Sequence, residues 1–192
     1  MTIGFNHLGR HGRLGNQMFQ YAGLRGIAAH KGYDFAIPPS DFNDEWNDHQ
    51  LFEAFKLTGL TNIEQIPGPY VQEAHFHFDQ NLFDNMPDGH NVYAYLQSTK
   101  YFEHIEEEIR EDFEFKNDIH LPCKEMMNTL QDPIALHVRR GDYIQNSDNH
   151  PPCPKEYYDT ALSKFDNNRT VVVFSDDPDW CSTEFPDDRF LI

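Results

Sequence analysis

The chain of 192 residues has few cysteines, few basic residues and no long apolar run. Its three cysteines, Cys123, Cys153 and Cys181, are widely spaced, which excludes a CxxC zinc site and a dense disulfide framework. We interpret them as free thiols of a reducing compartment. No apolar stretch approaches the roughly 18 residues that span a bilayer, and the N-terminus has no basic-then-apolar signal pattern. These absences predict a cytoplasmic protein, and peripheral association with a membrane is compatible with them.

The shortage of basic residues gives the chain a net charge of −17, from 15 Lys and Arg against 32 Asp and Glu. Such a chain repels the backbone of DNA or RNA, so we expect no nucleic-acid partner. A small anion such as a nucleotide can still bind where arginines cluster, because local donors decide its affinity. The hydrophobic content of 39%, with 16 Phe and 9 Tyr, indicates a globular protein with a real core.

The first part of the chain has the pattern of a parallel α/β domain. We expect a strand over residues 3–8, a Gly- and Arg-rich loop, a helix over 17–30 and a strand over 33–37. This strand, loop, helix, strand order favours a parallel sheet. The following stretch is less regular, with helices expected over 48–57, 103–112 and 123–130 and short strands near 70–78 and 92–96.

Beyond Pro133 the pattern is that of a βαβ unit. Ile134, Leu136 and Val138 alternate as in a strand, a helix follows, and the apolar run 171–174 predicts a second strand that is buried on both faces. Residues 186–192 have the pattern of the approach to a third strand. Binding loops of such units lie at the carboxyl ends of the strands, which here are residues 139–143 and 175–177.

The strongest candidate site is the string HVRRGDY, residues 137–143. Arg139 and Arg140 are two adjacent guanidiniums at a strand end, beside Gly141, which lets backbone approach closely. Their mutual repulsion is relieved by an anion, and a diphosphate accepts bidentate hydrogen bonds from a guanidinium. The alternative interpretation is an arginine pair held by salt bridges to nearby carboxylates.

A second candidate is the string GRLGNQ, residues 12–17, between a strand and a helix. Its small residues allow a tight turn, and a helix N-terminus offers free backbone donors to an anion or a sugar. It lacks the ending of a P-loop and the GxGxxG spacing. A simple turn is therefore an equal alternative.

A third candidate is the carboxylate pair Asp176 and Asp177, directly after the second strand. A carboxylate there can accept hydrogen bonds from N1 and the exocyclic N2 of guanine, a pattern that adenine does not offer. The alternative is an aspartate that caps the next helix.

Together these strings resemble the α-1,2-fucosyltransferases of glycosyltransferase family 11. The resemblance is carried, in order along the chain, by GRLGNQMFQYA (residues 12–22), YLQSTKYF (95–102), HVRRGDY (137–143), YYDTA (157–161) and FSDD (174–177). The third string also matches the HxRRxD motif shared more widely among α-1,2-, α-1,6- and protein O-fucosyltransferases. The matches cover nearly the whole chain, and five in the right order are more specific than any one.

The resemblance implies a GT-B-like α/β fold of two Rossmann-like domains with parallel sheets. We expect an acceptor-side domain at residues 1–132 and a partial GDP-fucose-binding domain at 133–192, the second incomplete because the family normally continues past residue 192. The implied reaction is inverting, metal-independent transfer of fucose from GDP-fucose to the 2-hydroxyl of a galactoside in glycan or lipopolysaccharide synthesis, without a cofactor.

The resemblance also implies the site residues. Arg139 and Arg140 would face the diphosphate, His137 with Asp176 or Asp177 would contact guanine, and the loop at Gly15 and Asn16 would close on the donor or acceptor. The expected donor-binding residues are therefore His137, Arg139, Arg140, Asp176, Asp177, Gly15 and Asn16.

Arg139, Arg140 and Asp142 are the expected catalytic residues, with Asp142 either the base for the acceptor hydroxyl or a partner that orients an arginine. Three alternatives stay open from the sequence. The first is an inactive, truncated remnant or glycan-binding module of the family. The second is a transferase that uses another nucleotide sugar. The third is a metal site at His75, His77 and Asp79, for which an ordinary strand is favoured. Self-association through an incomplete sheet edge is also expected.

Overall fold

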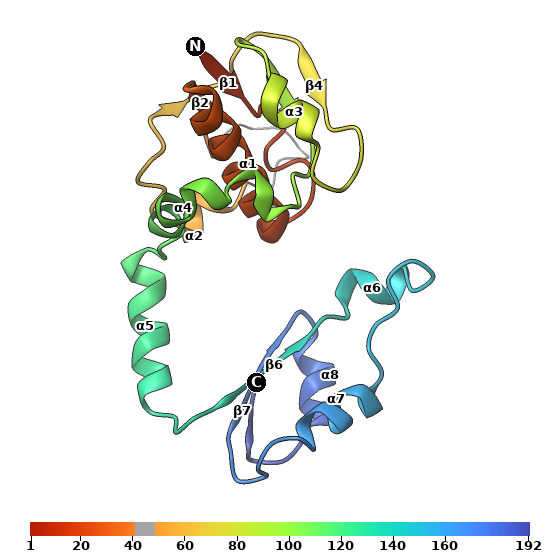
Figure 1. The fold of residues 1–192 in the computed structure, drawn as a ribbon. Coiled ribbons are helices and arrows are strands. Elements are labelled where there is room, and N and C mark those ends of the chain that lie inside the picture. The colour runs from red at the N-terminus through yellow and green to blue at the C-terminus, as the bar shows by residue number, and fades with distance from the viewer. Residues whose placement is uncertain (41–48) are drawn as a thin grey trace. The chain divides into compact units, whose positions relative to one another are not determined.

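A computed structural model describes residues 1–40 and 49–192, which form two compact units, residues 1–120 and 121–192 (Figure 1). The division falls within helix α5 (Asn117–Asn128), somewhat before the boundary expected at 132/133, and that boundary stays a prediction. The helix expected over 48–57 begins outside the described residues, and within them only α2 (Leu51–Ala54) is helical.

The first unit is built on a parallel sheet of five strands in the order β3-β2-β1-β5-β4. From β1 the chain steps to β2 and then β3 on one side, whereas β4 and β5 lie on the other side. The strand order therefore reverses between β1 and β5, the kind of position where open α/β sheets bind ligands. The strands are β1 (Thr2–Gly4), β2 (Asp34–Ile37), β3 (Asn62–Ile63), β4 (Tyr70–Gln72) and β5 (Asn91–Tyr93).

Two strands are shorter than the sequence predicts. β1 ends at Gly4 because the chain turns at once, with the N–H of Leu8 donating to the carbonyl of Phe5 at 3.0 Å. β4 ends at Gln72 because the N–H of Ala74 donates to the side chain of Asp79 at 3.1 Å instead of to a neighbouring strand. In both places a local hydrogen bond replaces the sheet ladder.

Helix α1 (Leu14–Lys31) confirms the helix predicted over 17–30 and packs against β1 and β2. It ends at Gly32, whose left-handed φ of 66° lets its N–H reach the carbonyls of Ala28 and Ala29. Gly26 allows a close approach to the helix, because a Cβ there would lie 1.9 Å from the backbone oxygen of Tyr101. The helix and the segment at Tyr101 therefore touch backbone to backbone.

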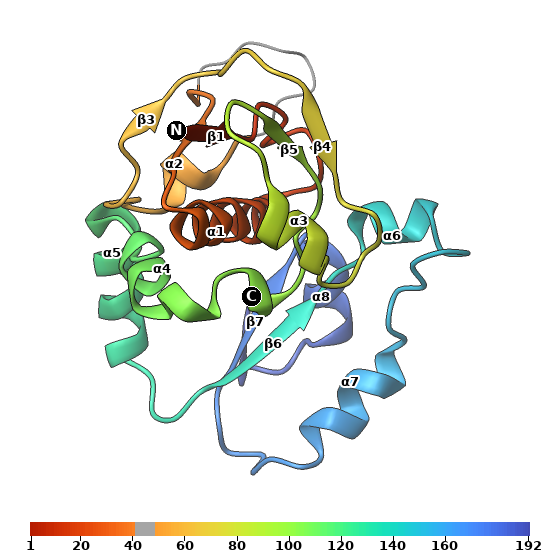
Figure 2. The same ribbon diagram turned by 45° about the horizontal axis from the view of Figure 1, so that its top comes forward.

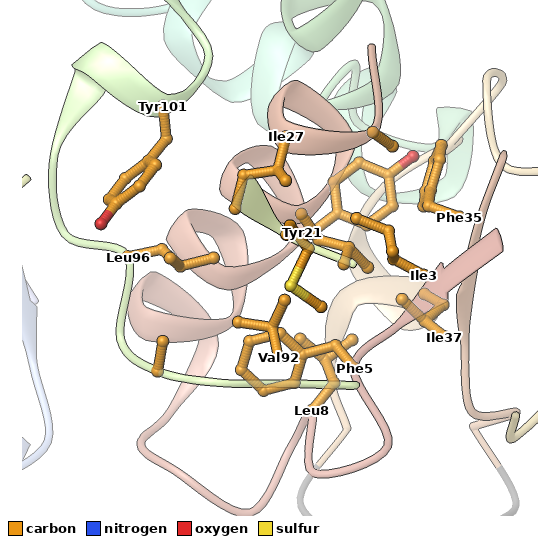
Figure 3. Packing of buried hydrophobic residues seen from close by; sticks show 14 of the residues in the cluster. Ile3, Phe5, Leu8, Tyr21, Ile27, Phe35, Ile37, Val92, Leu96 and Tyr101 are labelled. Atoms are coloured by element: carbon orange, nitrogen blue, oxygen red, sulfur yellow. The ribbon is translucent and has the colours of Figure 1, made fainter. Parts of the chain in front are cut away.

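The core of the first unit is apolar and aromatic (Figure 3). Tyr21 and Tyr101 are fully buried in it, together with side chains from β1, β2 and β5. The hydroxyl of Tyr21 donates to the buried carboxylate of Asp112 at 2.6 Å, and Arg25 forms an ion pair with the same carboxylate. Burial of Asp112 is tolerated because these partners satisfy its charge.

Short helices complete the first unit. The acidic helix predicted over 103–112 is confirmed as a 3₁₀ turn followed by α4, and the helix predicted from residue 123 begins earlier, as α5. The elements are α3 (Gln80–Asn85), η1 (Thr99–Tyr101), η2 (Glu103–Ile105) and α4 (Glu106–Asp112).

The second unit has a parallel sheet in the order β6-β7-β8, which confirms the predicted βαβ arrangement and the third strand. Helices α7 and α8 pack on one face of this sheet through Tyr158, Leu162 and Cys181, and Phe185, directly after α8, joins the same core. The elements are β6 (Ile134–Val138), α6 (Gly141–Gln145), α7 (Lys155–Leu162), β7 (Val171–Ser175), α8 (Pro178–Glu184) and β8 (Phe190–Leu191).

The prediction that residues 171–174 are buried on both faces is wrong at Phe174, which is 55% exposed. In β6, Ile134, Leu136 and Val138 are buried while Ala135 and His137 are exposed. His137 pairs in register with Phe174, so both lie on the face opposite to α7 and α8. Within this unit, helices cover only one face at that end of the sheet.

The architecture confirms the predicted α/β class with parallel sheets in two Rossmann-like units. All three cysteines are free thiols, with Cys181 buried and the other two exposed. No helix in the described part of the chain is long and apolar enough to cross a membrane.

Candidate functional site

The second unit brings two of the predicted loops together at one edge of its sheet. Arg139 and Arg140 follow β6, and Asp176 and Asp177 follow β7. Because β6 and β7 are adjacent and parallel, their carboxyl ends meet at the same edge. Helices α6 and α8 start from these two strand ends (Figure 2). We call this group of residues the strand-end site.

Arg140 is the most enclosed cation of the strand-end site. Its Nε donates to Oδ2 of Asp177 at 3.0 Å, and its guanidinium lies 4.0 Å from the ring centroid of Trp180. Its backbone N–H donates to Oδ1 of Asp176 at 2.8 Å. The side chain is 19% exposed, so the guanidinium is fixed in one direction by a carboxylate and an aromatic ring.

Arg139 is more open and is held by its own loop. It forms an ion pair with Asp142, 3.1 Å from Nη2 to Oδ2, and its guanidinium lies 4.6 Å from the ring centroid of Tyr143. The hydrogen bond with Asp142 raises the pKa of Arg139, which keeps the guanidinium charged. The placement of Asp142 against Arg139 fits the orienting role that was the alternative to a base.

These contacts are those of the alternative interpretation, in which carboxylates hold the arginine pair. They do not remove the donors that a diphosphate needs, because a guanidinium has five N–H groups and each ion pair occupies only part of them. The assignment of Arg139 and Arg140 to a diphosphate stays a prediction.

Asp176 ties the two strand-end loops together. Burial acts to raise its pKa, but hydrogen bonds from the backbone N–H groups of Arg140 and Gly141 outweigh burial and lower it. A Cβ on Gly141 would lie 2.8 Å from Oδ2 of Asp176. A side chain at position 141 would therefore push Asp176 away and loosen the backbone that carries both arginines.

Asp177 caps helix α8, which confirms the alternative given for it. Its Oδ1 accepts from the N–H of Trp180 at 3.2 Å, and Pro178 occupies the first helical position. The same carboxylate binds Arg140 through Oδ2. The predicted guanine contact of Asp176 or Asp177 is untested by this geometry and stays a prediction.

His137 has a different setting from the arginines. It lies on the exposed face of β6 beside Phe174, opposite to the helices of the second unit. An exposed imidazole next to an exposed aromatic ring can contact a flat base, but its role also stays a prediction.

The predicted residues Gly15 and Asn16 lie in the first turn of α1, in the first unit. Gly12 has a left-handed φ of 85°, and the amide of Asn16 packs so closely that a Cβ at Gly12 would lie 1.8 Å from it. Oδ1 of Asn16 accepts from Gln97 at 2.6 Å. A Cβ on Gly15 would meet no atom of the described residues within 4 Å. The geometry of the turn thus explains why glycine occupies position 12 and asparagine position 16. Packing gives no reason for a glycine at position 15.

Trp180 is a part of the strand-end site that sequence analysis did not assign. The string from Asp177 to Trp180 contains a signal for it, because an aspartate cap followed by proline starts a helix whose third residue turns back toward the capping side chain. The carboxylate that caps the helix and the ring that covers Arg140 are therefore placed by one short segment.

Two findings bear on the metal alternative. His75 and His77 stack with ring centroids 3.5 Å apart, and Asp79 caps α3 by accepting from the N–H of Leu82 at 3.0 Å. Across residues 1–40 and 49–192, no group of three or more His, Cys, Asp or Glu side chains is placed to hold a metal ion. The segment is a bend rather than the ordinary strand that was expected.

Known proteins resemble this chain in sequence and fold. The chain is 26% identical to an alpha-1,2-colitosyltransferase of Escherichia coli over 88% of its own length and 68% of the relative's. It is 25% identical to galactoside alpha-(1,2)-fucosyltransferase 2 of Sus scrofa, over 88% of this chain and 53% of that protein. The chain therefore spans only about half of the mammalian relative.

Among solved structures, the fucosyltransferase NodZ from Bradyrhizobium has a TM-score of 0.62 at 13% identity, over 99% of this chain and 77% of that one. A structure titled as NodZ alpha-1,6-fucosyltransferase soaked with GDP-fucose has a TM-score of 0.59 at 13% identity, over 99% and 76%. This likeness confirms the GT-B-like fold class. The family model described as glycosyl transferase family 11 matches residues 2–189, and the chain belongs to that family.

Proposed function

We propose that this chain transfers L-fucose from GDP-fucose to the 2-hydroxyl of a galactoside acceptor. The observation that carries the proposal is the arginine pair at the end of β6, in which Arg140 is fixed between Asp177 and Trp180. Membership of family 11 supports a glycosyl transfer, and the arginine pair supports a nucleotide diphosphate as its leaving group.

The charge of the leaving group gives the arginines their role. When the bond between the sugar and the β-phosphate breaks, the electron pair stays on GDP and its negative charge grows. A fixed guanidinium interacts more strongly with that charge in the transition state than in the ground state, which accelerates the step. Two arginines supply this charge without a metal ion.

The transfer itself is an inverting displacement at the anomeric carbon. The oxygen of the acceptor hydroxyl forms the new bond on the face opposite to GDP while the old C–O bond breaks. The hydroxyl proton passes to a base or to water. Asp142 is the motif carboxylate near the arginines, but its ion pair with Arg139 favours orientation of that guanidinium over proton transfer.

Guanine preference is proposed to come from the carboxylates that follow β7. Each carboxylate has about four lone-pair sites, and the contacts of Asp177 with Arg140 and with the N-terminus of α8 leave capacity for a base. The exposed His137 and Phe174 offer a flat surface beside it. GDP is therefore the expected nucleotide.

A second candidate function differs from the first in the sugar that is transferred. One relative is named a colitosyltransferase and another a fucosyltransferase, at nearly equal identity of 26% and 25%. Transfer of a sugar other than fucose from a GDP donor is therefore the second candidate function. Competition of GDP-fucose with GDP-mannose and with UDP-sugars for the same site separates guanine preference from sugar preference.

Calorimetric titration of the 192-residue chain with GDP tests the proposal. We expect micromolar binding that Arg140→Ala abolishes. Arg169→Ala is the matched control, because Arg169 precedes β7 and pairs with Asp132 at the amino ends of the strands. Its affinity for GDP should equal that of the unmodified chain.

Transfer from radiolabelled GDP-fucose to a galactoside then tests catalysis. Binding of GDP without transfer would support the alternative of a non-catalytic, glycan-binding member of the family. A folded chain that binds no GDP would contradict the proposed donor site.

A further inference from the structure

The first unit contains a cavity of about 290 Å³ at the carboxyl edge of its sheet. It is lined by His11 from the loop after β1, by residues 72–76 at the end of β4, and by residues 93–95 at the end of β5. Of these strands, β1 and β5 flank the point where the strand order reverses, and β4 lies beside β5 at the edge of the sheet. The cavity therefore lies where parallel α/β sheets place their ligands.

The lining is largely aromatic, and no Lys or Arg side chain belongs to it among residues 1–40 and 49–192. Phe76 is 78% exposed and its ring centroid lies 5.9 Å from that of Tyr95. Burial and the nearby charge of Arg10 lower the pKa of His11, so its imidazole is neutral near pH 7. With Glu73 in the lining and Arg10 outside it, the cavity is poorly suited to phosphate, and its rings and polar side chains fit an uncharged ligand with both apolar and hydrogen-bonding faces.

The walls of the cavity are held by a network beneath them. Oε2 of Glu73 accepts from the backbone N–H of Tyr95 at 3.1 Å, and Oε1 accepts from the hydroxyl of Tyr101 at 3.0 Å. Asp79 belongs to the same network. Its N–H donates to the hydroxyl of Tyr101 at 2.8 Å, and its carboxylate accepts from the backbone N–H of Ala74. The carboxylate of Glu73 thus serves to connect the two walls.

The polar side of the cavity is formed by Gln72, His75 and His11. Nε2 of His11 is buried and has no hydrogen-bond partner among the described residues, while its ring meets that of Tyr93 at a centroid distance of 4.7 Å. A buried nitrogen without a partner is unusual in a folded protein and marks a place where a ligand hydroxyl or water can bind after a small movement.

We propose that this cavity is a subsite for one sugar ring of the glycan acceptor. The apolar C–H face of the ring lies on Phe76 and Tyr95, and its hydroxyls face Gln72 and the histidines. The volume of about 290 Å³ lies just below the range of about 300–1,000 Å³ for small-molecule sites, which suits a single ring. The inference rests on the proposed function, because that function supplies the glycan.

Saturation-transfer NMR of the 192-residue chain with methyl β-D-galactopyranoside tests the subsite. We expect saturation transfer to the ring protons of the sugar. The Kd should be roughly 2- to 10-fold higher in Phe76→Ala and in Tyr95→Ala, because each variant loses one aromatic contact. Phe76→Tyr should keep the affinity, because it preserves the ring. Phe115→Ala is the matched control, an exposed aromatic of the same unit that does not line this cavity.

GDP titration of the same samples separates this inference from the proposed function. Loss of sugar binding in the two alanine variants, with GDP affinity unchanged, supports the subsite. Two results would overturn the subsite and leave the donor proposal intact. One is normal GDP binding by a chain that shows no NMR saturation transfer to the sugar. The other is equal sugar binding in all variants. Sugar binding that the alanine variants lose, in a chain that does not bind GDP, supports the subsite and contradicts the proposed donor site.

Discussion

Asp177 caps helix α8 with one carboxylate oxygen and holds Arg140 with the other, at 3.2 Å and 3.0 Å respectively. One side chain thus connects the start of a helix to the cation proposed to bind the diphosphate. Substitutions of Arg140 and of Asp177 should therefore change ligand binding and helix stability to different degrees.

Arg140→Lys should lower the affinity for GDP about 10-fold, although the charge is kept. A lysine has no planar group to stack on Trp180 and cannot bind a diphosphate through two parallel N–H groups. Calorimetry of this variant beside Arg169→Lys measures the effect. Equal GDP affinity in both variants would show that charge alone matters at position 140.

Asp177→Asn should keep α8 intact but weaken the preference for guanine. Asparagine caps a helix about as well as aspartate, so the melting temperature should change little. The amide oxygen is a weaker partner for two guanine donors than a carboxylate. The ratio of the Kd for ADP to the Kd for GDP should fall several-fold, and an unchanged ratio would assign guanine recognition elsewhere.

Gly141→Ala should weaken GDP binding without unfolding the second unit. The new Cβ would displace the carboxylate of Asp176, which holds the backbone of Arg140. The displaced atom ends a flexible side chain, so the cost to stability is small. A circular dichroism melt and a GDP titration report the two effects separately.

Gly15→Ala provides the opposite case in the first unit. A Cβ at position 15 meets no atom within 4 Å in the described part of the chain, and alanine is a better helix former than glycine, so stability should rise by about 0.5 kcal/mol. If the loop contacts the donor or acceptor as expected, transfer activity should fall in the same variant. Unchanged activity would leave the turn as the full explanation of the motif.

Acid should destabilise the first unit in part through Asp79. Burial acts to raise the pKa of Asp79, but hydrogen bonds from the N–H groups of Leu82, Ala74 and Asn81 outweigh it and lower the pKa below its ordinary 3.8. A lowered pKa in the folded state means that the stabilisation is complete above pH 3.8 and is lost as the pH falls through the folded value.

The Asp79→Asn variant tests this dependence. Asparagine can still cap α3 through Oδ1, but its amide nitrogen cannot accept from the N–H of Ala74 as Oδ2 of Asp79 does. We therefore expect the variant to be less stable than the unmodified chain by about 1 kcal/mol near pH 6.5, with the difference shrinking below pH 3.8. Calorimetric melts at both pH values measure it, with the exposed Asp148→Asn as control. A difference that stays constant with pH would exclude Asp79 as a source of acid sensitivity.

The sequence predicted the second unit well because its signals are local. Alternation of Ile134, Leu136 and Val138 defines β6, and the residues after each strand follow directly from its end. The exposed position of Phe174 was missed because an apolar run alone does not show which faces of a sheet are covered. The ring of Trp180 was missed because its contact with Arg140 crosses between two strand ends.

The cavity of the first unit could not be predicted from the sequence. His11, Phe76 and Tyr95 are far apart in the chain, and only the strand order brings them to one edge. The local pattern near residue 76 also suggested a longer strand. β4 ends where the side chain of Asp79 accepts from the backbone N–H of Ala74. Asp79 caps α3, so this hydrogen bond depends on where α3 lies.

The backbone contact between Gly26 and Tyr101 has a thermodynamic consequence for that cavity. Because α1 has no side chain at position 26, Tyr101 is fixed against the helix, and its hydroxyl fixes Glu73 and through it Tyr95. The side chain of Glu73 and the backbone of Tyr95 are therefore held in place before any ligand arrives. A sugar ring that binds there would cost little conformational entropy of the protein, so its affinity would depend mainly on the contacts it makes.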